Sequence, residues 1–386
     1  MMFEIPEWEF EERIRRIQAE LAKRGLDALI TFGNEAEPQY VRYLADYWPA
    51  FETAGVLVPV EGEPILVIGP ESYTYAKSRS KIAKIRRVLA YRESAEPEYP
   101  GEKLTTFEEL FDEASNGRGI RRLGLVGYSI LPVPIYEGIR KAMKDGEVIR
   151  ADEILIKMRM IKSENELALH RVAYRLAKIG LSAALEKVRP GMTEIKVTSI
   201  AREAMMQAGA EAEGFPMWCV SGPNTNQAIS RPTYRKIQKN ELVQIQVGAR
   251  VGGYTSSIGR PFVLGKAPDD VKKLMEVGLE AELAVLRAMR TGIPAKEVDR
   301  AFRETVRGMG FGDWLLYGPC HGTGLMECEH PWIESNSDWR LEENMVFNVD
   351  IFLCGQTLGL RFEDGVRVTK DGVEELSNFR REVIEL

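Results

Sequence analysis

Histidine and cysteine are scarce in this sequence. Its 386 residues include only 3 histidines and 4 cysteines. No two cysteines form a CxxC pair, and so few cannot build a disulfide scaffold, so we expect a reduced, cytoplasmic protein. No stretch approaches the ~18 apolar residues of a membrane helix. The N-terminus is acidic and lacks a long apolar run, which predicts that it is no signal peptide.

The charge pattern excludes further functions. The 52 basic and 58 acidic side chains give a formal net charge of -6, spread along the chain rather than in blocks. A basic face for nucleic acid or for an anionic membrane is therefore not expected. What remains is an ordinary globular composition, with 44% hydrophobic and 28% charged residues. The chain is long enough for two domains.

The first half predicts an α/β domain, because strands alternate with helices. Apolar residues at spacings of three and four predict a helix that Gly25 ends. The aromatic cluster of Tyr47, Trp48 and Phe51 is interpreted as core packing, and the alternative is that it reaches into a site, such as one of a partner subunit. The predicted helices are residues 9–24, 72–84, 106–114 and 133–143, and the predicted strands are residues 26–32, 55–59, 64–68, 86–89, 122–126 and 148–151.

The second half predicts an internal repeat. In each copy two helices precede two strands, at residues 242–248 and 253–264 in the first and at residues 345–352 and 359–368 in the second. A capping box of Ser163 and Glu166 opens the first long helix. Two such copies predict pseudo-twofold symmetry, with a cleft between the paired strands. The residues that recur 101 positions later are Ala183, Leu185, Arg189, Gly191, Val197 and Gly209, which reappear as Ala284, Leu286, Arg290, Gly292, Val298 and Gly310.

One short stretch, residues 320–331, concentrates the reactive side chains. It holds two of the three histidines, His321 and His330, and two of the four cysteines, Cys320 and Cys328. Because neighbours on a strand point to opposite faces, Cys320 is expected to point away from His321. The third histidine, His170, lies on the first long helix and is predicted at the surface. This stretch is the best candidate for the chemistry of the protein.

Several motifs, in order, resemble those of the creatinase/prolidase/aminopeptidase P family, which has the pita-bread fold. The resemblance implies an α/β N-terminal domain at residues 1–155 and an α+β, pita-bread catalytic domain at residues 156–386. It also implies a hydrolase that acts on a small-molecule substrate and forms a homodimer. The motifs are found at residues 25–29, 40–44, 160–166, 247–250, 321–325 and 361–366.

Carried over to this sequence, the family's metal-ligand set is incomplete. Family peptidases hold two divalent metals through two aspartates, a histidine and two glutamates. The aspartate positions are Gln246 and Ser257, the histidine is His321, and the glutamate positions are Asp350 and Glu363. Two carboxylates cannot offset the repulsion between two dications, so we expect no metal cofactor. The alternative is a single Mn, Co, Zn or Fe ion on His321, Asp350 and Glu363.

The family's catalytic histidines are also replaced. Cys328 stands seven residues after His321, where prolidase-like members have a second histidine. The loop at residues 221–230 has no histidine. In the metal-free member creatinase, a catalytic histidine corresponds to Ile229 and its acidic partner to Gly259. The sequence therefore matches neither catalytic set.

These departures leave three functional hypotheses. The leading one is a metal-independent, creatinase-like hydrolase of a C–N bond in a small polar substrate. In it, His321 is the acid-base group and Glu363 and Asp350 are its carboxylate partners. The alternatives are an Xaa-Pro dipeptidase or aminopeptidase with an atypical mononuclear metal site, and a non-catalytic ligand-binding homologue. The residues expected to bind the substrate are Gln246, Ser257, Cys328 and Arg361.

Overall fold

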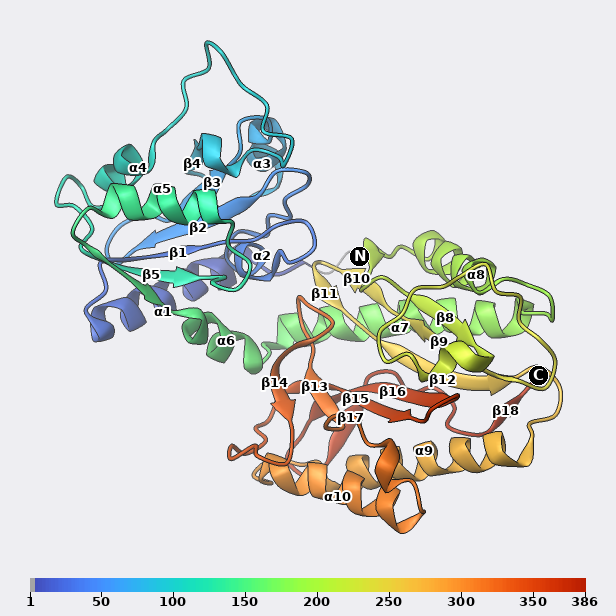
Figure 1. Ribbon diagram of the computed structural model, residues 1–386. Coiled ribbons are helices and arrows are strands. Elements are labelled where there is room, and N and C mark those ends of the chain that lie inside the picture. Colours follow the sequence, from blue (N-terminus) through green and yellow to red (C-terminus); the bar gives the residue numbers. More distant parts are fainter. Residues whose placement is uncertain (1–3) are drawn as a thin grey trace. The chain divides into compact units, whose positions relative to one another are not determined.

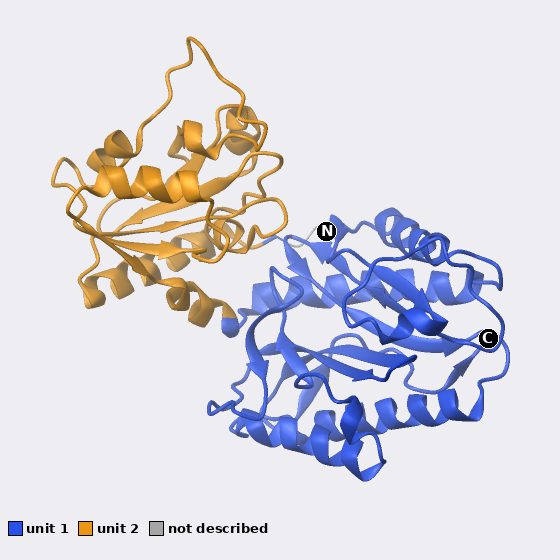
Figure 2. Ribbon diagram, in the orientation of Figure 1, with its two compact units in different colours: residues 1–4, 160–386 blue, residues 5–159 orange. Residues whose placement is uncertain are grey.

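The computed structural model describes residues 4–386, and the chain falls into two compact units (Figures 1 and 2). Residues 5–159 form one unit, and residues 160–386 belong to the other. Residues 1–3, on which part of the signal-peptide prediction rests, lie outside the described residues. Within residues 4–386, no helix is both long enough and apolar enough to cross a membrane.

The N-terminal unit is built on a six-stranded mixed sheet in the order β4-β3-β2-β1-β5-β6. β1, β5 and β6 are parallel, whereas β2 is antiparallel to both of its neighbours. The predicted alternation of strands and helices is confirmed. The elements are α1 (Glu7–Arg24), β1 (Ala28–Thr31), α2 (Gln39–Ala45), β2 (Ala54–Pro59), β3 (Ile65–Ile68), α3 (Tyr73–Arg79), β4 (Ile85–Arg87), η1 (Leu89–Tyr91), α4 (Phe107–Ala114), β5 (Arg122–Val126), α5 (Val133–Met143), β6 (Glu147–Arg150) and α6 (Asp152–Met160).

The aromatic cluster of this unit is divided between core and surface. Tyr47 is fully buried, so core packing is confirmed for it. Trp48 is half-buried, and its Nε1 donates a hydrogen bond to the carbonyl of Glu35 at 2.9 Å. For Phe51 core packing is wrong, because 84% of the residue is exposed. Phe51 also has a φ of 58°, in the left-handed region that residues other than glycine seldom adopt.

The C-terminal unit contains a nine-stranded sheet, a small three-stranded sheet and two pairs of long helices. Its helices are α7 (Glu164–Lys187), α8 (Glu194–Gln207), η2 (Gly222–Asn226), α9 (Asp269–Ala288), α10 (Ala295–Gly308) and η3 (Gly312–Trp314). Its strands are β7 (Ala212–Glu213), β8 (Trp218–Ser221), β9 (Leu242–Val247), β10 (Ala249–Val251), β11 (Tyr254–Thr255), β12 (Ile258–Val263), β13 (Cys320–Gly322), β14 (Glu329–Ile333), β15 (Val346–Cys354), β16 (Gly359–Val368), β17 (Val373–Glu375) and β18 (Ile384–Glu385).

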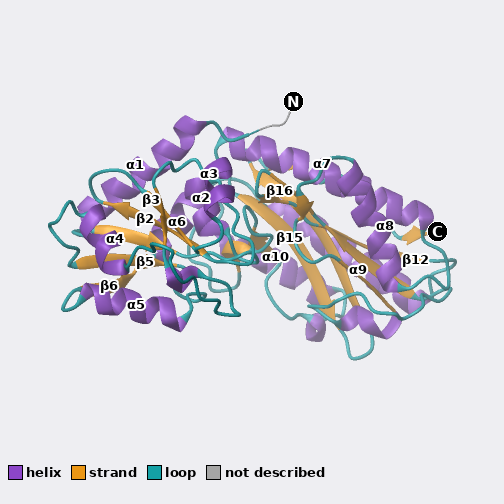
Figure 3. Ribbon diagram, turned by 90° about the horizontal axis from the view of Figure 1, so that it is seen from above, coloured by secondary structure: helices purple, strands orange, loops and turns teal. Residues whose placement is uncertain are grey.

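The predicted repeat is visible in the order of the large sheet, β14-β13-β15-β16-β12-β9-β8. From the central β16–β12 pair outward, β15 and β13 of the second half-repeat follow on one side. On the other side β9 and β8 of the first half-repeat follow. The helices α8 and α10 are offset by 101 residues, as are the first residues of β12 and β16. The pair α7 and α8 packs on the first half of the sheet, and α9 packs on the second (Figures 1 and 3). Pseudo-twofold symmetry is therefore confirmed.

Local signals explain how the first long helix, α7, begins. The backbone N–H of Ser163 donates to Glu166 Oε2 at 2.6 Å, and the N–H of Glu166 donates to Ser163 Oγ at 3.1 Å. The two bonds satisfy amide groups that have no partner within the helix. The predicted capping box is thereby confirmed.

The predicted surface position of His170, also on α7, is wrong. Its side chain is fully buried, and its ring packs against Tyr174 and Tyr254. The ring Nδ1 lies 3.0 Å from the carbonyl oxygen of Thr255, to which it donates. Burial lowers the pKa of His170 to about 3, so the imidazole is neutral. The reason is the small sheet of β10 and β11, which covers this face of α7.

Candidate active site

Four strands of the large sheet contribute one row of residues to the same face of the sheet. Gln246 on β9 pairs with Gly259 on β12, and Gly259 pairs with Glu363 on β16. Glu363 in turn pairs with Asp350 on β15. Residues directly opposite one another in an antiparallel sheet project from the same face. The row therefore brings polar groups of both half-repeats together.

Gly259 allows this row to be compact. A Cβ atom at this position would lie 2.7 Å from Gln246 Oε1 and 3.1 Å from Glu363 Cβ. Any side chain here would push these two groups apart. The absence of a side chain is thus a steric requirement of the site.

His321 joins the same face from β13. It pairs with Asn348 on β15, which lies two residues before Asp350 and so shares its face. The ring also packs against Trp332 on β14, with 5.2 Å between centroids. Cys320 points to the opposite face and is fully buried in the core, as predicted.

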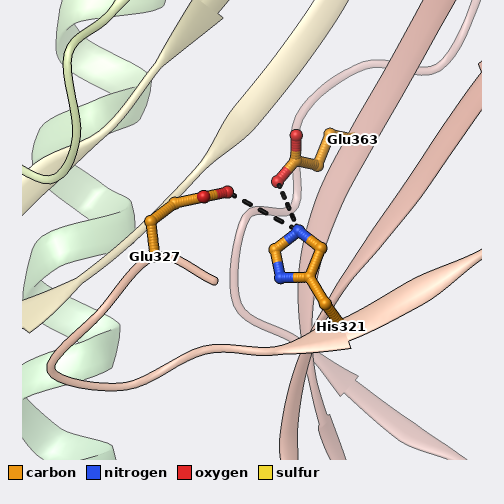
Figure 4. A group of neighbouring side chains, drawn as sticks. All are labelled: His321, Glu327 and Glu363. Carbon is orange, nitrogen blue, oxygen red and sulfur yellow. Dashed lines mark ion pairs between the residues drawn. The ribbon is translucent and has the colours of Figure 1, made fainter. Parts of the chain in front are cut away.

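A carboxylate that the sequence had not singled out completes the cluster around His321. His321 Nε2 lies 3.6 Å from Glu327 Oε1 and 3.9 Å from Glu363 Oε1 (Figure 4). Within the described residues, the possible ligand atoms of these three side chains all lie within 4.8 Å of one another. Glu327 belongs to the turn between β13 and β14. Only its membership of the reactive stretch could have signalled it.

The other ring nitrogen of His321 fixes the tautomer. Nδ1 lies 3.1 Å from the carbonyl oxygen of Gly322, which can only accept, so Nδ1 carries the hydrogen. Burial by itself would lower the pKa of His321, but Glu327, Cys328 and Glu363 raise it well above its usual value. Burial raises the pKa of Glu363, and the neighbouring charges of Asp350 and Glu327 add to the rise. The cluster therefore favours a positive charge between imidazole and carboxylates.

Asp350 is committed to other partners. Its Oδ2 accepts a hydrogen bond from Tyr317 Oη at 2.9 Å, and its Oδ1 lies 3.4 Å from Arg361 Nε. The ion pair is buried, with 8% of the Arg361 side chain and 5% of the Asp350 side chain exposed. The cluster around His321 thus contains Glu327, whereas the ligand set predicted from sequence contains Asp350.

Arg361 lies in an aromatic surrounding beside this pair. Its guanidinium lies over the rings of Trp218 and Phe352, at 5.5 and 5.0 Å from their centroids. Its Nη2 donates to Tyr317 Oη at 2.7 Å and to the carbonyl of Ala228 at 2.8 Å. The planar cation is therefore fixed in position, which suits it to bind a carboxylate.

The remaining predicted site residues differ in their exposure. Gln246 Nε2 donates to Ser257 Oγ at 3.0 Å, and both residues are buried, so they form a neutral pair. Cys328 is exposed and lies beside His321. His330 is also exposed.

The loop that carries Ala228 is held by one buried carboxylate on α8. Glu194 Oε1 accepts from the N–H and the hydroxyl of Ser221, both at 2.8 Å, and from Asn224 Nδ2 at 3.1 Å. Its Oε2 accepts from the N–H of Thr233 at 2.9 Å and from its hydroxyl at 2.6 Å. Glu194 therefore holds both ends of the loop that borders Arg361.

Comparison with known families covers almost the whole chain. The creatinase/prolidase N-terminal domain matches residues 13–161, and metallopeptidase family M24 matches residues 168–370. The chain belongs to metallopeptidase family M24. The family resemblance inferred from the sequence motifs is thereby confirmed.

Two relatives of this M24 chain are similar to it over almost their full length. The Xaa-Pro dipeptidase of Pyrococcus horikoshii is 28% identical over 375 residues, which cover 97% of this chain and 99% of that protein. That of Pyrococcus furiosus is 27% identical over 372 residues, which cover 94% of this chain and 100% of that protein. The two therefore align with both units of the M24 chain.

Solved structures confirm the expected pita-bread fold. The prolidase structure from Pyrococcus horikoshii has a TM-score of 0.83 at 26% identity and covers 97% of this chain and 100% of that one. The X-Pro aminopeptidase structure from Thermotoga maritima has a TM-score of 0.84 at 23% identity and covers 97% of this chain and 99% of that one.

These findings favour the Xaa-Pro peptidase alternative over the leading hypothesis. M24 is a family of metallopeptidases, and the full-length relatives carry the name Xaa-Pro dipeptidase. Nothing in the comparisons supports a metal-independent reaction. That Gln246, Ser257 and Asp350 stand at family ligand positions stays a prediction from the sequence.

Proposed function

We propose that this M24 chain hydrolyses Xaa-Pro dipeptides or closely related small compounds, and that it does so with a single divalent metal. The observation that carries the proposal is the shared face of the sheet. It combines a cluster able to hold a cation, around His321, with a fixed guanidinium, that of Arg361, in aromatic surroundings. A small substrate with a peptide bond and a free carboxylate needs both features.

The residues around His321 fit a metal ion. Glu363 is fully buried, and within residues 4–386 neither of its carboxylate oxygens has a hydrogen-bond partner. One histidine and two carboxylates form a ligand set suited to zinc, manganese, iron or cobalt. A bound ion would polarise the scissile carbonyl and acidify a water molecule.

The other side chains would bind and orient the substrate. The guanidinium of Arg361 would attract the substrate carboxylate. The rings of Trp218, Phe352 and Trp332 would pack against a proline ring and exclude water. These roles use the predicted substrate-binding residue Arg361 and add aromatic residues that the sequence does not single out.

A metal-independent hydrolase is the second candidate. It is supported by the neutral pair of Gln246 and Ser257, which brings no charge to the cleft. In that case a proton would take the place of the cation, and His321 would act as general acid and base.

The test is a substrate panel under controlled metal content. Protein treated with a chelator and then supplied with Mn²⁺, Co²⁺, Zn²⁺ or Fe²⁺ is incubated with Xaa-Pro dipeptides and with matched Xaa-Ala dipeptides. We expect turnover of the proline substrates only after metal is restored. Chelator-resistant turnover of small amides or amidines would instead establish the second candidate. If no compound is turned over, the protein is a ligand-binding homologue.

The implied homodimer and the cytoplasmic location stay predictions. Light scattering of the purified protein tests the first, and fractionation of the source cells tests the second.

A further inference from the structure

Glu363 has an unusual environment for a buried carboxylate. It is fully buried, and no described residue donates a hydrogen bond to either oxygen. Burial of a carboxylate is costly unless a donor or a cation compensates it. The imidazole of His321 is one candidate, but its Nε2 lies 3.9 Å from Glu363 Oε1, too far for a hydrogen bond.

The geometry of His321 adds to the need for a cation beside Glu363. Because Nδ1 donates to the carbonyl of Gly322, the neutral ring turns the lone pair of Nε2 toward the carboxylates of Glu327 and Glu363. Three electron-rich atoms then converge on one point. Such an arrangement is stable only around a cation, which is a proton or a metal ion.

Glu327 is held in the orientation that a ligand needs. Asn348 Nδ2 lies 3.3 Å from Glu327 Oε1 and 3.4 Å from the Glu327 carbonyl oxygen, and it donates to both. Tyr174 donates its hydroxyl hydrogen to Asn348 Oδ1, which fixes the amide. Outer residues that orient a ligand in this way are typical of metal sites. About a fifth of the Glu327 side chain, 20%, is exposed, which leaves a path for an ion.

Charge also limits the number of ions to one. Two carboxylates and a neutral imidazole balance one dication. The third carboxylate of the cleft, Asp350, is neutralised by Arg361 and accepts the hydrogen bond of Tyr317. Asp350 Oδ1 also has no hydrogen-bond partner among the described residues, but a metal there would compete with the Arg361 cation 3.4 Å away.

We propose that Glu327 is a metal ligand and that the chain binds one divalent cation on His321, Glu327 and Glu363. This set differs at one position from the single-metal set expected from the sequence, because the turn residue Glu327 replaces the strand residue Asp350. The inference names the cofactor site of the proposed function. It rests on the contacts of these three side chains and does not depend on the substrate.

The test compares two carboxylate variants, Glu327→Gln and Asp350→Asn, by titration of the metal-free protein with Zn²⁺, Mn²⁺ or Co²⁺. Calorimetry and metal analysis after gel filtration give affinity and stoichiometry. We expect one equivalent in the unaltered protein and an affinity at least ~10-fold lower in Glu327→Gln. Asp350→Asn should keep one equivalent.

Two results would overturn the proposal. If Asp350→Asn loses the metal while Glu327→Gln keeps it, the ion sits on His321, Asp350 and Glu363. If the unaltered protein takes up none of the three ions, the cation of the cluster is a proton. A variant that can still ligate, Glu327→His, separates loss of a ligand from misfolding, because it should restore binding. Circular dichroism of each variant reports on the fold.

The outcome is separable from that of the substrate panel. Protein that binds one ion but hydrolyses no Xaa-Pro dipeptide would reject the proposed activity and leave the metal site standing. Turnover of Xaa-Pro dipeptides by a protein that binds no metal would reject the metal site and leave the substrate class standing.

Discussion

Gln246 and Ser257, which both belong to the first half-repeat, form a hydrogen bond with each other. Their hydrogen bond of 3.0 Å uses the amide as donor and the hydroxyl as acceptor. Across Gly259 lies Glu363, so the charged and the neutral sides of the row are separated by a single residue without a side chain. A second metal ion beside the first would find no anionic ligand on the neutral side.

Restoring charge at these two positions should restore a second metal site. We expect the double variant Gln246→Asp, Ser257→Asp to bind more Mn²⁺ or Co²⁺ than its parent. Without metal it should unfold at a lower temperature, because two buried carboxylates then repel one another. Excess metal should reverse this loss, since binding to the native state alone stabilises it. Metal analysis after gel filtration and thermal unfolding measure both effects.

The control is Gln238→Asp, which adds a negative charge at an exposed position of the same unit. It should change neither metal content nor stability. Equal metal content in the double variant and its parent would show that the missing carboxylates were not the obstacle.

Residues on strands could be placed from the sequence, and the turn residue could not. The repeat puts His321, Asp350 and Glu363 on paired strands, and alternation along a strand then gives their common face. Glu327 has no such periodicity to reveal it. Its approach to His321 depends on the path of the turn between β13 and β14, which spacing in sequence does not determine.

At the scale of elements, the packing of α7 on β10 and β11 buries His170 in its neutral form. The unfolded imidazole has a pKa of ~6.5, whereas the folded one has a pKa of about 3. As the pH falls below the pKa of the unfolded state, the unfolded state binds a proton that the folded state does not bind. Stability contributed by this group is therefore complete above pH ~6.5 and is lost progressively down to pH ~3.

We expect the His170→Gln variant to lose less stability on acidification than its parent. An amide can still donate to the carbonyl of Thr255 but does not titrate. Between pH 7 and pH 5 the free energy of unfolding of the parent should fall by about 2 kcal/mol more than that of the variant. Urea unfolding at the two pH values measures the difference. Every other titrating group is common to both proteins, so parallel pH curves would contradict the assignment.

Strand positions were predicted better than strand partners. The strand predicted at residues 253–264 is two strands, β11 and β12, separated at Ser256 and Ser257. β11 pairs with β10 in the small sheet, whereas β12 pairs with β9 and β16 in the large one. The sequence of a strand does not reveal by itself that the strand changes its partner. The change matters because it brings Ser257 to the cleft, beside Gln246.

At the scale of the molecule, a buried ion-pair network joins the two half-repeats of the C-terminal unit. Arg260 on β12 donates from Nη2 to both carboxylate oxygens of Asp364 on β16, each at 2.9 Å. Arg381 donates to Asp364 Oδ2 at 2.7 Å and to Glu282 Oε1 on α9 at 3.3 Å. Burial would raise the pKa of Asp364, but Arg260 and the other donors lower it to about 2. The network thus ties β12, β16, α9 and the C-terminal segment together.

Removing the central cation should destabilise the whole unit. We expect Arg260→Met to lower the free energy of unfolding by about 3–5 kcal/mol, because the buried carboxylate of Asp364 loses a hydrogen-bonded cation. Guanidinium chloride unfolding of the purified protein measures this change.

The matched control is Arg380→Met. Its ion pair with Glu382 is exposed by 45% and 55% on the two side chains, so the loss should stay below about 1 kcal/mol. Equal effects of the two substitutions would mean that the network contributes no more than a surface pair.

On β12 and β16, Gly259 and Glu363 face the candidate site. Their chain neighbours Arg260 and Asp364 belong to the buried ion-pair network on the opposite face. One face of these strands therefore carries the candidate site, and the other carries the ion pairs that stabilise the unit. Donor groups can be exchanged at positions 246, 257, 327, 350 and 363 while the opposite face keeps the backbone in place. The same scaffold can accordingly be tuned in steps, from holding a proton to holding one metal ion or two, by altering side chains alone.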